Sequence, residues 1–395
     1  MAEWKKVKVG DIGKVVTGKT PKTSNSEYYG GNIPFLTPSD DMSVKYVRGT
    51  NKYITESGRL SVKNATLPAN AICISCIGSD LGKVVITTQE TVTNQQINSI
   101  VVDTDNFDVD FVYYSMLELG KILNFHSKTS TAVPIVNKSS FSQYEIDCPE
   151  LSVQKKIGDI LSSIDKKIEE NNKINNNLEQ QAQAYFDELF VVNADPNWPE
   201  CTLSDIGSVV AGGTPSKSKL EYYVDQGIAW ITPKDLSVDK SKFISHGEND
   251  ISELGFSKSS AMKMPAGTIL FSSRAPIGYI AIAQNEVTTN QGFKSVIPNE
   301  NIGTAYMYFL LKNLLPTIEG MASGSTFKEI SGAAMKSVPT VMPDADTIQL
   351  FSNFCEPVFK EQEVLEAENK HLSALRDSLL PKLMSGELDV SHIDL

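Results

Sequence analysis

The sequence has few of the residues that build metal sites, disulfide frameworks or membrane spans. Its 395 residues include 5 cysteines and 4 histidines. A scattered, odd-numbered set of cysteines fits a reducing compartment rather than a disulfide-bonded scaffold. No stretch approaches the roughly 18 apolar residues of a membrane helix, and the first residues lack the apolar centre of a signal peptide. We therefore expect a cytoplasmic protein with no membrane association.

Signatures of catalysis are also missing. The sequence has neither the glycine loop and Asn/Asp-Pro-Pro-aromatic tetrad of a methyltransferase nor the carboxylate–lysine clusters of a nuclease. Cys73 and Cys76 form a single C-x-x-C inside the apolar run AICISCIG. Because a zinc site normally needs four ligands, these two cysteines are expected to be buried strand residues. The chain is predicted to be non-catalytic and to bind no metal or cofactor itself.

The net charge of −12 argues at first against nucleic acid as a partner. Most of the excess acidity, however, lies outside two long regions. Residues 1–150 and 198–343 each carry a net charge of −1, whereas residues 151–197 carry −3 and residues 344–395 carry −7. The two near-neutral regions are compatible with basic patches, and the acidic last segment is compatible with a protein partner.

The most informative feature present is an internal repeat. Residues 11–21 read DIGKVVTGKTP and residues 205–215 read DIGSVVAGGTP, with 8 identities in 11 positions. Further matches follow in the same order: IPFLTPSD (33–40) with IAWITPKD (228–235), and TNQQINSIV (93–101) with TNQGFKSVI (289–297). A period near 195 residues is too long for a solenoid unit, so the chain contains a duplicated domain. Two similar domains suggest a target that has two parts.

Each copy is expected to be mostly β-structure with one helix. Short β-branched and aromatic runs are separated by Gly, Pro, Asn and Asp, which is typical of strands and turns. One helix is expected near Val109–Leu123, with a counterpart near Thr304–Leu315. The expected strands of the first copy are Lys14–Thr17, Ile33–Thr37, Ala71–Ser75, Val84–Thr87 and Ser99–Val102.

After each copy, apolar residues recur at a spacing of three and four, which predicts a long helix. The helices are expected over Ser152–Phe190 and from about Thr347. A helix of nearly 40 residues would be ~55–60 Å long and could not bury its apolar stripe on one small domain, so antiparallel pairing of the two helices is expected. Asn171 and Asn175 interrupt the first stripe; they either fix the register as buried residues or mark a polar kink or exposed face. The stripe residues, which are candidates for partner docking, are Ile157, Leu161, Ile164, Ile168, Leu178, Val358, Leu365, Leu372, Leu375 and Leu379.

These patterns together predict an α+β fold. Two similar, mostly-β recognition domains, residues 1–150 and 198–343, are joined by two long antiparallel helices in residues 151–191 and 344–395. The two halves are expected to be related by a pseudo-twofold axis.

One motif suggests a different class of function. Gly13–Thr20 matches the phosphate-loop pattern G-x-x-x-x-G-K-[ST]. Such a loop needs a helix that opens at its Lys-Thr, and Pro21 disfavours a helical residue before it. The second copy has Gly213 in place of Lys19. NTP binding therefore remains only an alternative interpretation, of a different functional class.

Polar residues in the predicted loops are the candidates for DNA contact. Asn and Gln can pair with adenine, and Arg or Lys with guanine, although capped turns and salt bridges use the same side chains. Residues shared by both copies are expected to serve the fold or contact phosphate, whereas residues that differ are better candidates for base reading. The candidates are Lys19, Thr20, Lys22, Ser39, Asn94, Gln95, Gln96, Asn98, Thr214, Ser216, Lys217, Lys234, Arg274, Asn290, Gln291, Lys294, Ser325 and Lys328.

The ordered motifs resemble those of the specificity subunits of type I restriction–modification systems. The matching elements are D-I-G-x-V-x-x-G-x-T-P, the F/W-h-T-P-x-D strand (h apolar), T-N-Q, the STFKEI loop (325–330) and the helical segments at 151–172 and 372–390. The first copy departs from the pattern at residues 130–135, which read STAVPI. This departure weakens any shared role for Lys328.

The resemblance implies that each domain reads one half of a bipartite site in double-stranded DNA. It also implies that the helices set the spacer and dock two methyltransferase subunits, which bind S-adenosylmethionine, and that a motor/nuclease subunit joins the restriction complex. Two alternatives remain open beside NTP binding. One is a recognition subunit of another DNA-modifying or phage-defence complex, and the other is a two-headed structural or adaptor protein.

Overall fold

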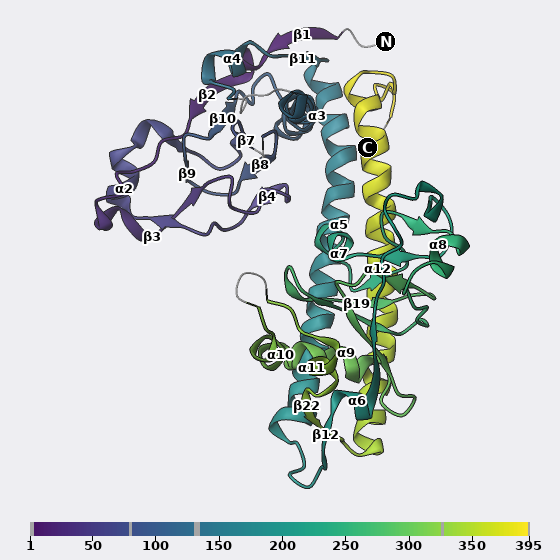
Figure 1. Ribbon diagram of the computed structural model, residues 1–395. Helices are drawn as coiled ribbons and strands as arrows, with labels where there is room; N and C mark the ends of the chain where they lie inside the picture. Colours follow the sequence, from purple (N-terminus) through teal and green to yellow (C-terminus); the bar gives the residue numbers. More distant parts are fainter. Residues whose placement is uncertain (1–3, 79–80, 130–134, 325–327, 394–395) are drawn as a thin grey trace. The chain divides into compact units, whose positions relative to one another are not determined.

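The chain folds into two compact units. The computed structural model describes residues 4–78, 81–129, 135–324 and 328–393. Unit 1 comprises Met1–Glu169 and Lys370–Leu395, and unit 2 comprises Glu170–Asn369. Each unit therefore contains a head, meaning one copy of the repeat, together with a part of each long helix (Figure 1). These helices are α5 (Leu151–Asp187) and α12 (Ala345–Met384).

Each head is built on a five-stranded sheet with the same strand order. The order is β2-β10-β7-β8-β4 in unit 1 and β13-β21-β18-β19-β16 in unit 2. In both sheets the last pair is parallel and the other pairs are antiparallel, which confirms the internal repeat at the level of the fold. The strands are β2 (Gly13–Thr17), β10 (Ile97–Val102), β7 (Ile72–Ser75), β8 (Val84–Thr87), β4 (Tyr46–Val47), β13 (Gly207–Ala211), β21 (Lys294–Pro298), β18 (Ile269–Ser273), β19 (Ile277–Ala283) and β16 (Phe243–Ile244).

Smaller sheets complete the heads. In unit 1 a four-stranded sheet has the order β5-β3-β9-β6, whereas in unit 2 the corresponding strands form two-stranded sheets, β15 with β20 and β14 with β17. All five strand runs expected in the first copy lie in or overlap strands, so those predictions are confirmed. The strands are β3 (Tyr29–Leu36), β5 (Tyr53–Ile54), β6 (Thr66–Leu67), β9 (Thr91–Thr93), β14 (Tyr223–Val224), β15 (Trp230–Ile231), β17 (Asp250–Ile251) and β20 (Thr288–Thr289).

Further short elements close each head. β1 (Lys5–Lys8) pairs with β11 (Glu145–Cys148), and β12 (Glu200–Thr202) pairs with β22 (Pro339–Val341). The short helices are α1 (Val9–Ile12), α2 (Glu56–Ser61), α4 (Lys138–Gln143), α6 (Leu203–Ile206), α7 (Pro233–Val238), α8 (Glu253–Ser257) and α11 (Gly332–Lys336).

The helix that covers each central sheet differs between the units. In unit 1 the expected helix is α3 (Val109–Thr129), which extends beyond the predicted end. In unit 2 the expected helix is α9 (Thr304–Asn313), which ends two residues before the predicted end, and a separate helix, α10 (Leu315–Met321), follows it. Pro316 lies in the first turn of α10, where its missing N–H costs nothing.

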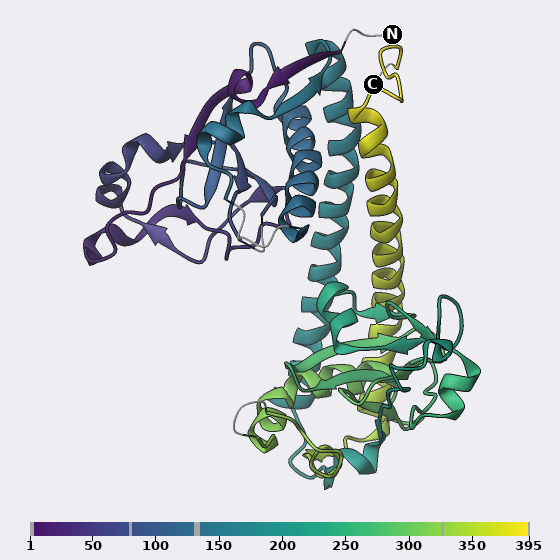
Figure 2. The same ribbon diagram turned by 45° about the horizontal axis from the view of Figure 1, so that its top comes forward.

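Both cores join the head to the long helices. In unit 1 the buried side chains of α3, including Tyr114, pack with Leu161 of α5 and Leu383 of α12; Figure 2 shows α3 lying between the sheet and α5. In unit 2, Phe186 of α5 and Phe351 of α12 pack together, with ring centroids 5.7 Å apart. The head and the helix parts within one unit thus share one hydrophobic core.

The long helices run antiparallel, as the sequence predicts. In unit 2 the amide of Asn175 on α5 donates to Glu366 on α12 at 3.3 Å, and Tyr185 lies against Phe354 with ring centroids 4.8 Å apart. Asn171 is fully buried and donates to Glu368 at 2.7 Å. The continuity of α5 through this residue favours the buried-asparagine interpretation over a kink, and its role in fixing the register stays a prediction.

The prediction that the apolar stripe is a surface for partner docking needs correction. Ile157, Leu161 and Ile164 are buried in the core of unit 1, and Leu365 is buried in unit 2. Leu375 is 39% exposed. The stripe residues pack within the chain, against the head and against the other long helix. The remaining members, which are partly buried, are Ile168, Leu178, Val358, Leu372 and Leu379.

Among the described residues, no helix is both long enough and apolar enough to cross a membrane.

Candidate functional site

The motifs shared by the two copies hold the loops of each head in place. In unit 1 the Thr20 hydroxyl donates to the Gln95 side chain at 2.7 Å, and in unit 2 Thr214 bonds Gln291 in the same way. The Tyr29 hydroxyl donates to the carbonyl of Pro21 at 2.7 Å, and Tyr223 donates to the carbonyl of Pro215 at the same distance. The Thr-Pro loop and the Thr-Asn-Gln loop are therefore joined by their own side chains in both heads.

The glycine before each Thr-Pro loop is required by a close approach of two backbones. A Cβ on Gly18 would lie 2.0 Å from the carbonyl oxygen of Asn94, and one on Gly212 would lie 2.1 Å from that of Asn290. Real Cβ atoms do not reach such distances. The repeated G-x-T-P spacing thus reflects packing of the two loops.

Replacing Gly212 with alanine is expected to destabilise unit 2 by about 1–3 kcal/mol, since the loops must move apart. The measurement is urea unfolding followed by tryptophan fluorescence, since two of the three tryptophans, Trp198 and Trp230, lie in unit 2. Gly320→Ala is the matched control, because a Cβ at that site meets no described atom within 4 Å. Equal losses in the two variants would contradict the packing role.

The second shared motif, T-P-x-D, is a helix-capping or turn device. In unit 2 the carboxylate of Asp235 accepts from the backbone N–H and the hydroxyl of Thr232, both at 2.7 Å, at the start of α7. In unit 1 Asp40 accepts from Thr37 in the same pattern, at 2.7 and 2.9 Å. The Thr and Asp side chains of this motif bond each other within the head. They therefore have the structural role expected for residues shared by both copies.

The phosphate-loop match at Gly13–Thr20 lacks the geometry for NTP binding. Its first part is strand β2, and no α-helix opens at Lys19-Thr20 within the described chain. The backbone N–H of Lys19 donates to the carbonyl of Thr93 at 2.8 Å instead of pointing at a free anion site. The geometry therefore does not favour NTP binding.

Cys73 and Cys76 are buried, as predicted. Cys73 lies on β7 and is fully buried, and burial raises the pKa of its thiol to about 12. Cys76 follows the strand and is 2% exposed. Neither thiol is available as a reactive group.

In unit 2 several candidate residues line one cleft of about 700 Å³. Its walls carry cationic, amide and aromatic groups, which is a mixture suited to base edges and phosphates. Arg274 has a half-exposed side chain there (41%), and Trp230 forms part of the wall while its indole N–H donates to Gly213. The candidates that the cleft brings together are Thr214, Lys217, Lys234, Arg274, Asn290 and Gln291.

Most of the other candidates lie at the surface of their heads. Exposed positions are Lys19, Lys22, Ser39, Gln95, Ser216 and Lys328, and half-buried positions are Thr20, Asn94 and Gln96. Ser325 lies outside the described residues. Whether any of these side chains touches DNA stays a prediction.

Two candidates are corrected by the structure, because their side chains point into the protein. Asn98 is 2% exposed; it accepts from the Thr17 hydroxyl at 2.6 Å and donates to the carbonyl of Val136 at 3.0 Å. Lys294 is 8% exposed, and its amine lies 3.5 Å from a carboxylate oxygen of Glu329. Both residues belong to strands that are buried on both faces, so neither presents its side chain to a groove of DNA.

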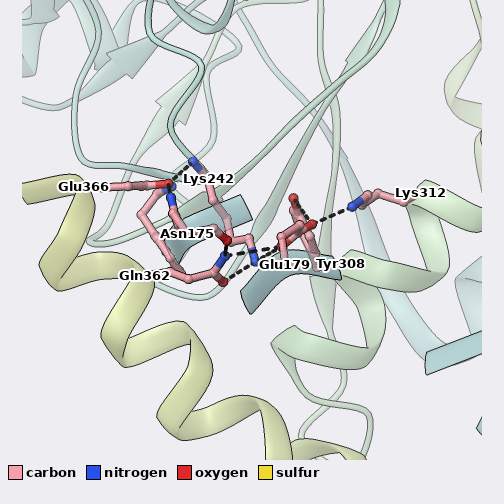
Figure 3. Close-up of polar contacts among 8 residues, drawn as sticks. Asn175, Glu179, Lys242, Tyr308, Lys312, Gln362 and Glu366 are labelled. Carbon is pink, nitrogen blue, oxygen red and sulfur yellow. Dashed lines mark hydrogen bonds and ion pairs between the residues drawn. The ribbon is translucent and has the colours of Figure 1, made fainter. Parts of the chain in front are cut away.

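A buried lysine attaches the head of unit 2 to the long helices (Figure 3). The Lys242 amine pairs with Glu179 of α5 and donates to Gln362 of α12 at 2.6 Å. The backbone N–H groups of Lys242 and Phe243 donate to Glu366 of α12 at 2.8 and 3.1 Å. The amine also lies 4.2 Å from the ring centre of Phe359. One strand end of the head is thus held by both helices.

Unit 1 has a lysine at the equivalent position. Lys45 precedes β4 as Lys242 precedes β16, and its amine bonds Asp110 at 2.8 Å and Ser162 of α5 at 3.0 Å. In both units the carbonyl of this lysine accepts from the central sheet at 2.7 Å. The buried lysine is therefore a repeated feature of the attachment between head and helix.

The carboxylate that pairs with Lys242 makes stability sensitive to acid. Burial raises the pKa of Glu179, but Lys242 and Lys312 outweigh burial, and the pKa is lowered overall. The unfolded chain then binds more protons at acidic pH, so the stability that Glu179 contributes is lost as pH falls from about 4.3 through its lowered folded pKa. In Glu179→Gln the free energy of unfolding, measured by urea unfolding, should fall less steeply as the pH is lowered below about 4.3. An unchanged slope would contradict this expectation.

The comparison with known proteins agrees with this architecture. A family model described as the type I restriction modification DNA specificity domain matches residues 1–180 and again residues 196–372. The chain belongs to this family. The two matches are the two heads with their helices, so each unit of the chain is built largely from one specificity domain.

Individual relatives carry the same description. The chain is 38% identical over 190 residues to the type I restriction enzyme MjaIX specificity subunit of Methanocaldococcus jannaschii, a match that spans 46% of this chain and 44% of that protein. It is 22% identical over 476 aligned positions to the HindI specificity subunit of Haemophilus influenzae, covering 98% and 100% of the two chains. A solved S subunit of a type I restriction-modification system from M. genitalium has the same fold, with a TM-score of 0.60 at 17% identity over 97% of this chain and 96% of that chain.

Sequence reasoning missed three groups of residues in these specificity domains. The buried Lys45 and Lys242 recur at matching positions of the repeat, before Tyr-Val and Phe-Ile, and this recurrence was the available signal. The aromatic wall of the cleft at Trp230 lies in the recognised I-A-W-I-T-P-K-D match. Glu329 lies in the STFKEI motif, but its pairing with Arg274, 55 positions away, has no signal in the sequence.

Proposed function

We propose that this chain is the DNA-specificity subunit of a type I restriction–modification complex. Each head reads one half of a bipartite site in double-stranded DNA, and α5 and α12 fix the spacing between the two half-sites. The chain itself is non-catalytic. The site chemistry comes from two methyltransferase subunits, which bind S-adenosylmethionine, and a motor/nuclease subunit joins for restriction in the cytoplasm.

One observation carries this proposal. The two heads have the same scaffold, down to the Thr20–Gln95 and Thr214–Gln291 bonds, yet they differ in the exposed side chains around it. A duplicated scaffold with different polar surfaces suits two half-sites of different sequence, because base edges are distinguished by the pattern of donors and acceptors that meets them. Membership of the specificity-domain family supports the same conclusion.

The proposal also accounts for the acidity of the chain. Residues 344–395 carry a net charge of −7, of which α12 contributes −3. Because most of the apolar stripe is buried or partly buried by contacts within the chain, the methyltransferase subunits would dock on the outward polar face of the helices. Much of the phosphate neutralisation would then come from those subunits, and the assembled complex would bind DNA in a salt-dependent manner.

The test is methylome sequencing of cells with and without this chain. The expected result is a methylated bipartite motif that disappears when the chain is removed and returns when it is restored. Co-purification with an adenine methyltransferase in two copies distinguishes a type I complex from another DNA-modifying assembly. A methylome that does not change on removal of the chain would refute the proposal.

A further inference from the structure

The structure places a charged cluster at one site where the two heads differ. In unit 2 Arg274 and Glu329 lie opposite each other in an antiparallel β-bridge, and the equivalent bridge of unit 1 joins Ile77 and Ile135. The residue beneath the bridge is Lys294 in unit 2 and Asn98 in unit 1, and both are buried. The same place in the fold is thus ionic in one head and apolar in the other.

The carboxylate of Glu329 is shared between two cations. One oxygen lies 3.4 Å from Nη1 of Arg274, and the other lies 3.5 Å from the amine of Lys294. The side chain of Lys294 is only 10% exposed, and its amine also lies 3.4 Å from the Ser273 hydroxyl and from the carbonyl of Gln291. A buried ammonium needs such compensation, so Lys294 and Glu329 hold each other in place.

Arg274 is left with donors that face the cleft. Its side chain lines the cleft beside Asn290 and Gln291 and is 41% exposed. Among the described residues, the guanidinium has a partner at Nη1 only. Arginine has five donors in a planar fork, so a bond to Glu329 at one nitrogen leaves an edge with two parallel N–H groups.

We infer that Glu329 is a positioning residue that orients Arg274 to read a guanine in the second half-site. This inference rests on the proposed function and adds a residue that does not touch the DNA. Two parallel N–H groups match O6 and N7 of guanine in the major groove. A fork fixed in advance loses less conformational freedom on binding, and it cannot rotate to serve another base. In unit 1 the equivalent Ile77–Ile135 bridge has no arginine and no carboxylate, so this way of reading guanine is specific to unit 2.

The experiment compares the affinity of the full chain, complexed with its methyltransferase, for duplexes that each carry one substituted base pair. Glu329→Gln keeps the shape of the side chain and removes its charge. We expect discrimination at one base pair of the second half-site to fall about twofold to tenfold, the cost of ordering one long side chain. Discrimination in the first half-site should not change.

Two further variants separate positioning from charge and from folding. Glu286→Gln removes an exposed carboxylate of the same unit that pairs with Lys263 and does not line this cleft, so it should leave base discrimination unchanged. In the Arg274→Ala background, Glu329→Gln should have no further effect, because a residue that acts only through Arg274 is silent without it. A merely structural role would instead weaken discrimination at several base pairs of the second half-site, or it would persist in that background.

Unchanged discrimination in Glu329→Gln, or an effect that survives in the Arg274→Ala background, would overturn the role of Glu329 and leave the proposed function standing. A wild-type complex that discriminates at no bipartite site would refute the proposed function, and the role of Glu329 with it.

Discussion

Lys242→Met is expected to lower the free energy of unfolding of unit 2 by about 3 kcal/mol, near the low end for breaking a buried ion pair. The amine of Lys242 is 94% buried by side-chain area and bonds both long helices, and its loss leaves Glu179 with Lys312 as its remaining cation. Burial lowers the pKa of Lys242, and the attraction of Glu179 offsets this lowering only in part. Urea unfolding followed by tryptophan fluorescence measures the change.

The control is Lys234→Ala, which removes an exposed lysine paired with Glu248 in the same head. Exposed pairs contribute at most about 1 kcal/mol, so this variant should be nearly neutral. A second variant, Lys242→Met with Glu179→Leu, should recover part of the loss because the buried carboxylate that lost Lys242 is removed as well. A loss for Lys242→Met no larger than for Lys234→Ala would show that the buried lysine does not attach the head to the helices.

Arg274→Ala is expected to cost about 1–3 kcal/mol of discrimination at one base pair of one half-site, the usual worth of a bidentate arginine–guanine contact. Arg274 is the only arginine in residues 198–343, so no neighbouring arginine can replace it. Affinities for duplexes with single substitutions, measured with the methyltransferase partner present, give the result.

Lys217→Ala provides the contrast, because Lys217 lines the same cleft but is a flexible point charge. Loss of one phosphate contact should weaken binding to all sequences alike and reduce the salt slope by about one. If Arg274→Ala also weakened all sequences equally, Arg274 would be a phosphate contact and not a base reader.

The architecture could be predicted from the sequence because the repeat offered two independent readings of each motif. The strands, the long helices and their antiparallel pairing follow from residue spacing, and the structure confirms them. The comparison of copies also distinguished scaffold from surface correctly at the Thr-Pro and Thr-Asn-Gln loops, whose shared side chains bond each other. Residue spacing was enough to predict these features because each is either local in sequence or present in both copies.

Side-chain direction could not be predicted in the same way. Asn98 and Lys294 differ between the copies, which made them candidate base readers, but both strands are covered on both faces. The local sequence does not show that a polar side chain on a strand points into the core. Its hydrogen-bond partners, such as Thr17 for Asn98, lie far away in the sequence. The buried Lys242 and the pair of Arg274 with Glu329 depend on tertiary contacts in the same way.

The claim that each head reads one half-site is tested most directly by a hybrid chain. In this hybrid, residues 198–343 are exchanged for those of a relative with a different target. Methylome sequencing of cells that carry the hybrid chain should show a motif in which one half-site has changed to that of the relative. The other half-site should be retained, since the first head is untouched. A hybrid that changes both half-sites, or neither, would contradict the reading of one half-site by each head.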